Sequence, residues 1–554
     1  MATSLRAQSG ASAIPNGDVN WWKGAVIYEI YPRSFGDTNG DGIGDLNGVT
    51  EHLDYLKSLG IDAIWLTPFY PSPQVDFGYD ISDYRAIDPQ YGTMADFDRL
   101  VAEAKKRGIG VICDMVLNHT SDKHPWFIES SSSRTNPKAD WYIWDNAKPN
   151  GKPPNNWISI FGHSAWQWDP ARKQFYYHDF YIAQPDLNWR NTSVRKAMYD
   201  VLRFWMDRGV MGFRLDAITS LFEDLALRDE PVDKPGINAY GDPLLSDVYT
   251  NNLPEVHDVL KQLRETINAY PGRVLIGETY LRTAKDLDAM YGKHNDELQL
   301  PMDTQLGFSN QLSAANLRQK LRDAELDISG HMPLLVFDNH DNPRSWNRYG
   351  DGVHDLAIAK LLATLLLTPR DTALVYYGQE LGMVESTPAR KEDVKDPIGI
   401  IGWPKEKGRD GERTPMQWNA DTDAGFSTSQ KTWLRVASDY KTINVSAEEK
   451  NSGSLLNYYK QLIAMRKRDH IFSNGSFALI DENNSSVLSY LRKGPDDSRI
   501  LVSLNCTAQH QSVSLKLNSR LKPLLASFSP KSETLDSENL QLPPFGSLVA
   551  QVNR

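Results

Sequence analysis

The sequence has little of several features that would assign it to a common protein class. Of its 554 residues only Cys113 and Cys506 are cysteines, which excludes a disulfide-rich scaffold. Cys113 lies in an apolar run (109–116) typical of a buried strand, so we expect two reduced structural thiols. Lys and Arg number 60 against 71 Asp and Glu, and the net charge of −11 disfavours nucleic acid as a partner.

Long apolar runs are also missing. The first twenty residues lack the apolar core of a signal peptide, and the best candidate for a membrane span, Leu361–Leu367, is far too short. We therefore expect a cytoplasmic protein with no membrane partner. Aromatic residues are plentiful, with 15 Trp and 24 Tyr, which favours a sugar-binding cleft because flat rings pack on the apolar faces of sugars.

Short apolar runs typical of strands alternate with helical patterns from about residue 25 to residue 470. Alternating strands and helices imply parallel strands joined by right-handed crossovers. The length suits a (β/α)₈ TIM barrel, which is the predicted fold. The expected strands are Val26–Tyr31, Ala63–Leu66, Val111–Val116, Phe213–Leu215, Val274–Gly277, Leu334–Phe337 and Leu374–Tyr376, with a poorly marked one near Gln299–Phe308.

The alternation of strands and helices is interrupted twice and then ends. Residues 119–189 are rich in Trp, Asn, Pro and Tyr, and predict an insertion domain after the third strand. It divides the barrel into a first part (1–118) and a second part (190–469), and a loop-rich insertion near 383–430 follows the eighth strand. Over 470–554 apolar and polar residues alternate between turns, which predicts a small antiparallel β domain.

Polar side chains follow four of the predicted strands. The segments are DMVLNH (114–119), GFRLDA (212–217), LIGET (275–279) and FDNHD (337–341). The active sites of barrel enzymes form at this face, from the ends of several strands. Carboxylates crowded there repel one another, a cost that a structural role does not explain. The four segments together therefore predict an active site.

These four segments resemble the signature regions of the α-amylase clan, glycoside hydrolase family 13. GYDISDY (78–84), QPDLNW (184–189) and RTPMQW (413–418) are similar, more narrowly, to the branch of oligo-1,6-glucosidases and α-glucosidases. The resemblance covers roughly residues 20 to 550. It implies an enzyme that cleaves α-glucosidic bonds and retains the configuration at C1.

The resemblance assigns roles at the catalytic centre. Asp216 would be the nucleophile that attacks C1, and Glu278 would protonate the leaving oxygen and later activate water. Asp341 would bind the 2- and 3-hydroxyls and favour the cationic transition state. Arg214 shares a strand face with Asp216 because strand side chains alternate, and its charge is expected to keep that carboxylate ionised. Asp114 has two interpretations, orienting Arg214 or capping its strand.

The resemblance also implies residues that bind the sugar. Tyr79 would stack on the non-reducing glucose, and Asp80 with Arg409 would bind its far hydroxyls and close the cleft into a pocket. For Phe180 a place in the core of the insertion domain is the alternative. Ala217 follows the nucleophile, where α-1,4-cleaving maltases tend to have Ala and oligo-1,6-glucosidases Val. The other residues implied at this subsite are His119, Phe180, Gln184 and His340.

The segment DTNGDGIGD (37–45) carries oxygen ligands at alternating positions, namely Asp37, Asn39, Asp41, the Ile43 carbonyl and Asp45. It resembles the first half of an EF-hand loop, although Gly48 stands where that loop has its glutamate, and also the metal loop of the same glucosidase branch. We predict one structural Ca²⁺ or Mg²⁺, with a hydrogen-bonded turn as the alternative. No organic cofactor is expected.

The expected substrates are maltose and short malto-oligosaccharides, with sucrose as a further candidate and some transglucosylation. The alternative enzyme is a glucosyl-transfer isomerase, such as a trehalose synthase or sucrose isomerase, with the same nucleophile and acid. The Arg-Leu-Asp-Arg run that sucrose isomerases tend to carry is absent. An inactive transporter heavy chain or a pure binding module is disfavoured because neither needs three carboxylates. A monomer or small homo-oligomer is expected.

Overall fold

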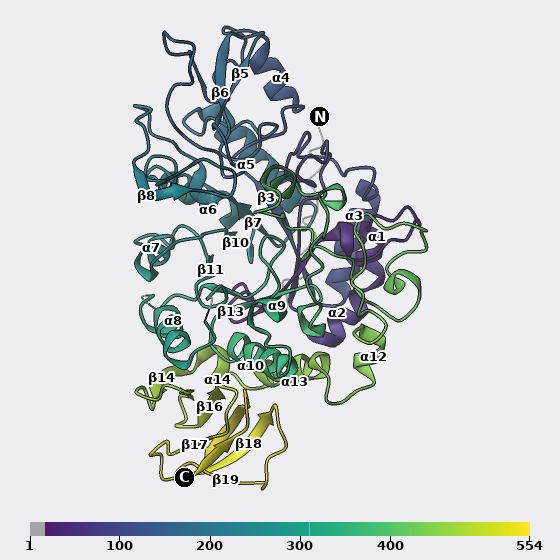
Figure 1. The fold of residues 1–554 in the computed structure, drawn as a ribbon, viewed down its shortest axis with the longest axis vertical. Helices are drawn as coiled ribbons and strands as arrows, with labels where there is room; N and C mark the ends of the chain where they lie inside the picture. The colour runs from purple at the N-terminus through teal and green to yellow at the C-terminus, as the bar shows by residue number, and fades with distance from the viewer. Residues whose placement is uncertain (1–16, 310, 329, 554) are drawn as a thin grey trace, which may run out of the picture.

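The computed structural model describes residues 17–309, 311–328 and 330–553. Figure 1 shows a barrel in the middle, a lobe around α4–β6 at one end and a carboxyl-terminal domain, in yellow, at the other. Residues 1–16, on which most of the signal-peptide expectation depends, lie outside the described residues. Cys113 and Cys506 are both free and buried, as predicted.

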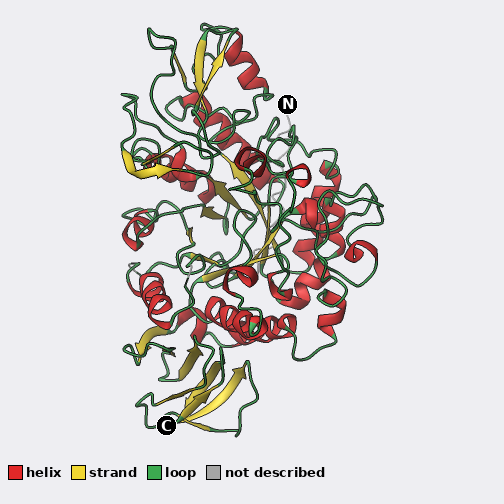
Figure 2. Ribbon diagram, in the orientation of Figure 1, coloured by secondary structure: helices red, strands yellow, loops and turns green. Residues whose placement is uncertain are grey.

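Eight parallel strands close into the central barrel, and they follow one another around it in chain order. This confirms the predicted (β/α)₈ barrel, and the poorly marked sixth strand is β11. Figure 2 shows these strands in the interior with the helices outside them. The strands are β1 (Val26–Ile30), β2 (Ala63–Leu66), β3 (Gly110–Val116), β7 (Gly212–Asp216), β10 (Val274–Gly277), β11 (Leu300–Asp303), β12 (Leu334–Val336) and β13 (Thr372–Tyr376).

Helices that follow the strands cover the outside of the barrel. In α3 a capping box between Thr93 and Asp96 begins the helix, and its apolar side chains recur at helical spacing on the buried face. Among the described residues no helix combines the length and apolar character needed to cross a bilayer. The helices are α1 (Leu46–Glu51), α2 (Leu53–Leu59), α3 (Met94–Lys106), α5 (Thr192–Asp207), α6 (Val256–Asn268), α7 (Ala284–Ala289), α8 (Ala314–Leu326), α9 (Ser345–Tyr349), α10 (Asp355–Leu367) and α13 (Leu455–Arg468).

The interior of the barrel is filled by side chains from alternate strand positions. Ile27, Trp65, Ile276 and Leu374 belong to this inner cluster, whereas Phe213 and its outward neighbours pack against the helices. The alternation directs the charged residues of β7 into the barrel, opposite to Phe213. The barrel therefore has an apolar interior beneath a charged layer at the carboxyl ends of its strands.

An insertion between β3 and α5 forms the lobe at one end of the molecule. It contains α4 (Pro125–Ser132) and a sheet in the order β4 (Trp144–Asp145), β6 (Gln174–Tyr177), β5 (Trp166–Asp169). A β-bridge between His119 and Asp186 joins the points where the chain leaves and re-enters the barrel. The lobe is therefore held over the carboxyl ends of the strands.

The carboxyl-terminal domain is a separate antiparallel sheet, as predicted. Its strand order is β14 (Ser476–Ile480), β15 (Val487–Lys493), β16 (Arg499–Asn505), β21 (Ser547–Asn553), β18 (Arg520–Ala526), β19 (Leu535–Asp536), with β17 (Gln511–Val513) and β20 (Leu540–Leu542) as a second pair. A fully buried ion pair at 2.7 Å links Arg492 of this domain to Glu325 of α8. This domain lies at the opposite end of the molecule from the insertion lobe (Figure 1).

Candidate active site

A cavity of about 340 Å³ opens at the carboxyl ends of the barrel strands, beneath the insertion lobe. Its volume lies at the lower end of the range of small-ligand pockets. Eight of the predicted site residues line it, namely Tyr79, His119, Phe180, Asp216, Ala217, Glu278, Asp341 and Arg409. The sequence did not indicate the other lining residues, which come from loops and short helical segments: Asp76, Ile160, Phe161, Thr219, Ser220, Asn251, Tyr280, Asn342 and Ile398.

The guanidinium of Arg214 lies at the centre of the charged layer and has no exposed surface. Its Nη1 contacts both oxygens of Asp114 at 3.0 Å and Asp216 Oδ1 at 2.6 Å. Its Nη2 lies 2.5 Å from Glu278 Oε1. The two predicted catalytic carboxylates therefore share one guanidinium, and Asp114 holds the same Nη1 that contacts Asp216. Of the two interpretations of Asp114, the geometry favours the orienting one.

Burial raises the pKa values of the two catalytic carboxyl groups. Burial raises the pKa of Glu278 to about 7, with the charge of Asp216 adding to the rise and Arg214 opposing it. Burial likewise raises the pKa of Asp216 to about 7, again against the charge of Arg214. Because the two carboxylates repel each other, the pair retains a proton near neutral pH. A nucleophile and a general acid need this state, with one carboxyl ionised and one protonated.

Asp341 has a different electrostatic environment. Arg409 Nη1 donates to its Oδ1 at 2.8 Å and Arg413 Nη2 at 3.0 Å, while His340 Nε2 lies 3.1 Å from its Oδ2. Burial on its own raises the pKa of Asp341, but these cationic and imidazole neighbours hold it well below the usual range. Asp341 therefore stays ionised in the pH range where the other two carboxyl groups exchange a proton.

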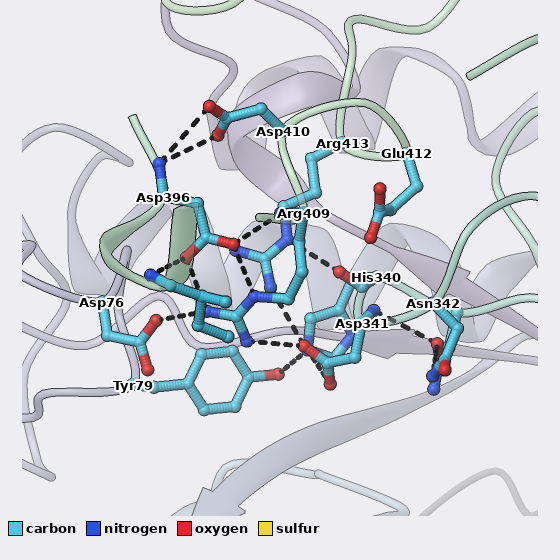
Figure 3. Close-up of polar contacts among 12 residues, drawn as sticks. Asp76, Tyr79, His340, Asp341, Asn342, Asp396, Arg409, Asp410, Glu412 and Arg413 are labelled. Atoms are coloured by element: carbon cyan, nitrogen blue, oxygen red, sulfur yellow. Dashed lines mark hydrogen bonds and ion pairs between the residues drawn. The ribbon is translucent and has the colours of Figure 1, made fainter. Parts of the chain in front are cut away.

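The predicted pairing of Asp80 with Arg409 is wrong, because Asp76 occupies that place (Figure 3). Arg409 Nη2 donates to Asp76 Oδ1 at 2.8 Å. The carboxylate of Asp80 instead accepts hydrogen bonds from Ser72, Val75 N and Asp76 N, and it does not line the cavity. Asp80 thus stabilises the turn that presents Asp76.

Two further predicted sugar-binding residues lie behind the cavity wall. Gln184 is fully buried and donates to Asp76 Oδ2 at 3.0 Å, so it supports Asp76 and does not line the subsite. Both ring nitrogens of His340 are occupied by protein groups, Nδ1 by Glu29 at 2.6 Å and Nε2 by the Tyr79 hydroxyl at 2.6 Å. His340 accordingly holds the Tyr79 hydroxyl and the Asp341 carboxylate in position, and it does not line the cavity itself.

His119 has a free nitrogen toward the cavity. Its Nδ1 is paired with Asn118, while its Nε2 has no hydrogen-bond partner within the described part of the chain. Burial lowers the pKa of His119 to about 3, so the imidazole is neutral and suited to a sugar hydroxyl. Tyr79 and Phe180 present their rings to the same cavity, and Phe180 does not lie in the core of the insertion domain.

Ala217 has an unusual backbone conformation. It lies in the left-handed region at φ 46° and ψ 37°, which non-glycine residues seldom adopt. This turn directs its backbone N–H toward Glu278 Oε2 at 2.8 Å. The residue after the nucleophile therefore helps to orient the predicted acid, while its methyl group lines the cavity.

The predicted cation loop forms a series of turns. Asp37, Asn39 and Asp41 each accept a hydrogen bond from the backbone N–H two residues ahead. Gly40 and Gly42 have positive φ, which allows the tight wrapping. Carboxylate, amide and carbonyl oxygens suit a hard cation, but no cluster of three or more His, Cys, Asp or Glu in metal-binding geometry occurs within the described ranges. The structural cation stays a prediction.

Comparison with known proteins agrees with this geometry. The model of the α-amylase catalytic domain matches residues 29–475. The chain is 42% identical to a probable α-glucosidase of Rhizobium meliloti, over 98% of each chain. It is 40% identical to the oligo-1,6-glucosidase of Parageobacillus thermoglucosidasius, over 87% of this chain and 90% of the relative.

A solved structure of the trehalulose synthase MutB has the same fold. It superposes with a TM-score of 0.89 at 36% identity, covering 96% of this chain and all of MutB. The match extends over the barrel, the lobe and the carboxyl-terminal domain together. From the family model and these relatives, the chain belongs to the α-amylase family, in the branch that contains the α-glucosidases and oligo-1,6-glucosidases.

Proposed function

We propose that this protein is a retaining, exo-acting α-glucosidase. It releases α-glucose from the non-reducing end of maltose and short malto-oligosaccharides, with sucrose as a further substrate and some transglucosylation. The observation that carries the proposal is the sharing of Arg214 by Asp216 and Glu278 at the cavity wall. Carboxylates on neighbouring nitrogens of one guanidinium are close together, which favours a retaining enzyme over an inverting one that leaves room for water between them.

The reaction has two steps at C1 of the glucosyl ring. In the first, Asp216 attacks C1 while Glu278 gives its proton to the departing oxygen, which yields a β-glucosyl ester and a free sugar. In the second, ionised Glu278 takes a proton from water, the water oxygen attacks C1, and Asp216 leaves as a carboxylate. Arg214 stabilises Asp216 each time it carries negative charge. If a sugar hydroxyl replaces water, the same step gives transglucosylation.

The exo-acting mode rests on the closure of the cavity at one end. Asp76, Arg409 and Asp341 form a continuous ionic chain with contacts of 2.8 Å. This chain blocks passage of a longer glucan and presents charged groups to the terminal hydroxyls of one ring. A sugar hydroxyl can both donate and accept a hydrogen bond. The carboxylates can accept from it and the guanidinium can donate to it, so both functions of the hydroxyl find a partner.

The proposal also covers the location of the protein, its structural cation, its partners and its assembly. A cytoplasmic location is supported by the two free, buried thiols, because reduced cysteines are usual in a reducing compartment. A structural Ca²⁺ or Mg²⁺ in the 37–45 loop is supported by its oxygen donors. A saccharide is the proposed partner, with no nucleic acid or membrane and with a monomer or small homo-oligomer as the assembly.

Product analysis tests the proposal. The protein is incubated separately with maltose, isomaltose, sucrose and trehalose, and proton NMR follows the first product. We expect α-glucose to appear before mutarotation, fastest from maltose. β-Glucose as the first product would exclude retention, and no release from any of the four sugars would refute the α-glucosidase assignment.

A glucosyl-transfer isomerase is the second candidate function. The structural likeness to the trehalulose synthase MutB supports this candidate. It would use the same carboxyl pair and return the glucosyl group to the released sugar instead of water. The sucrose incubation separates the two functions. Equal amounts of glucose and fructose indicate hydrolysis, whereas a new disaccharide with little free sugar indicates an isomerase.

A further inference from the structure

The loop that follows β13 contains a buried carboxylate, Asp396, that does not itself line the cavity. Asp396 has no exposed surface and begins the short helix α11 (Pro397–Gly402), where its Oδ1 accepts from Ile398 N at 3.2 Å. No sequence motif indicated this residue, because it lies in the loop-rich insertion outside the strand-end motifs.

Most of the hydrogen bonds to this carboxylate come from a single residue, Arg409. The backbone N of Arg409 donates to Asp396 Oδ2 at 2.6 Å, Nε to the same oxygen at 2.8 Å, and Nη2 to Oδ1 at 3.0 Å. The Nε and Nη2 contacts form the bidentate fork that fixes the plane of a guanidinium. Figure 3 shows this pair together with Asp76 and Asp341, which contact the same guanidinium.

The fork uses the Nε–Nη2 edge of the guanidinium and leaves the Nη1–Nη2 edge facing the sugar-binding carboxylates. From that edge Nη1 reaches Asp341 and Nη2 reaches Asp76, each at 2.8 Å. A long arginine side chain has many rotamers, and two contacts at its tip alone do not define its plane. The fork with Asp396 fixes the plane of the Arg409 guanidinium. The hydrogen bond from the Arg409 backbone N to Asp396 also fixes the position from which this side chain starts.

The loop is built to hold Asp396 in this place. The Asp410 carboxylate accepts hydrogen bonds from Lys395 N at 2.6 Å and Asp396 N at 3.1 Å. Gly408 has φ +77°, and a Cβ there would lie 2.8 Å from the Cβ of Asp396. Burial raises the pKa of Asp396 but the charge of Arg409 outweighs it and lowers the pKa to about 2, so the carboxylate is ionised at neutral pH.

We propose that Asp396 is a positioning residue for the glucose-binding end of the cavity, acting on the substrate through Arg409. The inference rests on the proposed function, because it assumes that Asp76, Arg409 and Asp341 bind the terminal glucosyl ring. The competing explanation is that Asp396 only starts α11 and stabilises its loop. Both predict a less stable variant, but only the first predicts that the effect on substrate disappears when Arg409 is absent.

A double-mutant cycle distinguishes the two explanations. The variants are Asp396→Asn, Arg409→Ala and their combination, assayed for kcat and KM on maltose and for Tm. Asn keeps the shape and one acceptor for Ile398 N but removes the charge that holds the fork. We expect Asp396→Asn alone to lower kcat/KM on the order of tenfold or more, and to have less than a twofold further effect on Arg409→Ala.

Asp410→Asn serves as the matched control. It also removes a buried charge from this loop, but Asp410 contacts backbone N–H groups and not the Arg409 side chain. Its effect on kcat/KM is expected to be smaller than that of Asp396→Asn, whatever its effect on Tm, because the fork between Asp396 and Arg409 stays in place. An equal loss from Asp396→Asn in both backgrounds would overturn the proposal and leave a structural role.

Binding of 1-deoxynojirimycin, a glucose-shaped amine, provides a second measurement that needs no turnover. Calorimetric titration of the same four proteins is expected to show the same coupling, with Asp396→Asn weakening binding only when Arg409 is present. A wild-type protein that binds the amine with this coupling but hydrolyses no α-glucoside would refute the proposed function and retain the positioning role. Additive losses of affinity would refute the positioning role alone.

Discussion

Replacement of Glu278 by Gln isolates the proton that this residue gives to the leaving oxygen. Glu278 accepts from Ala217 N through Oε2 and pairs with Arg214 through Oε1. Gln has the same size and keeps one of these acceptors, so the cavity is expected to retain its shape. The variant loses both the transferable proton and the base that later activates water.

The magnitude follows from the two roles. General acid–base catalysis contributes about 10²- to 10⁴-fold, which corresponds to roughly 3–5 kcal/mol of barrier. We expect kcat on maltose to fall by at least this factor, because the sugar leaving group needs the proton. α-Glucosyl fluoride has a leaving group that needs little protonation, so its first step is expected to fall much less.

The pH dependence of maltose hydrolysis is a second test for the proton on Glu278. Burial raises the pKa of Glu278 to about 7, so wild-type activity on maltose should decline as pH rises through this value and the proton is lost. Glu278→Gln has no such proton, and its formation of the glucosyl ester from the fluoride should show no alkaline decline from this group. Near-normal maltose turnover in the variant, or an unchanged alkaline decline, would refute the assignment.

Three further predictions concern the cavity and the loop. Asp76→Asn should lower kcat/KM about 10- to 100-fold by removing a charged hydrogen-bond partner of Arg409, whereas Asp80→Asn should lower Tm and leave kcat/KM within about twofold. A larger loss of kcat/KM in Asp80→Asn than in Asp76→Asn would restore the pairing of Asp80 with Arg409 expected from the sequence. Ala217→Val should lower Tm because a β-branched residue is strained at φ 46°, and should shift preference from maltose toward isomaltose by roughly tenfold; an unchanged ratio would contradict the steric argument. Excess chelator should lower Tm by several °C if the 37–45 loop holds a cation, while an unchanged Tm with no metal in elemental analysis would indicate a plain turn.

The fold and the catalytic layer were predictable because they follow strand periodicity. β2 and β10 have the bounds expected from the sequence. In a parallel barrel the carboxyl end of each apolar strand lies at the active face, so GFRLDA and LIGET indicate that Asp216 and Glu278 lie there, while their catalytic roles came from the family resemblance. Alternation along β7 also directs Arg214 and Asp216 to one face, which the structure bears out in their 2.6 Å contact.

The residues that were misplaced lie in turns, where no periodicity applies. Asp76 and Asp80 are four positions apart in one loop, and the sequence pattern does not say which carboxylate bonds to the backbone and which faces Arg409. His340 follows a strand as predicted, but Glu29 and Tyr79, from distant segments, occupy its two nitrogens. Such tertiary partners are outside the reach of a local pattern.

The most direct test of the central claim is to trap the covalent intermediate. The Glu278→Gln protein is incubated with α-glucosyl fluoride, which forms the ester but leaves no efficient base to hydrolyse it. After quenching and digestion, mass spectrometry locates the added mass of one glucosyl residue. We expect the adduct on the Asp216 side chain, in the peptide that contains it, and no adduct in Asp216→Asn. An adduct on another residue, or no adduct while the fluoride is consumed, would contradict the proposed mechanism.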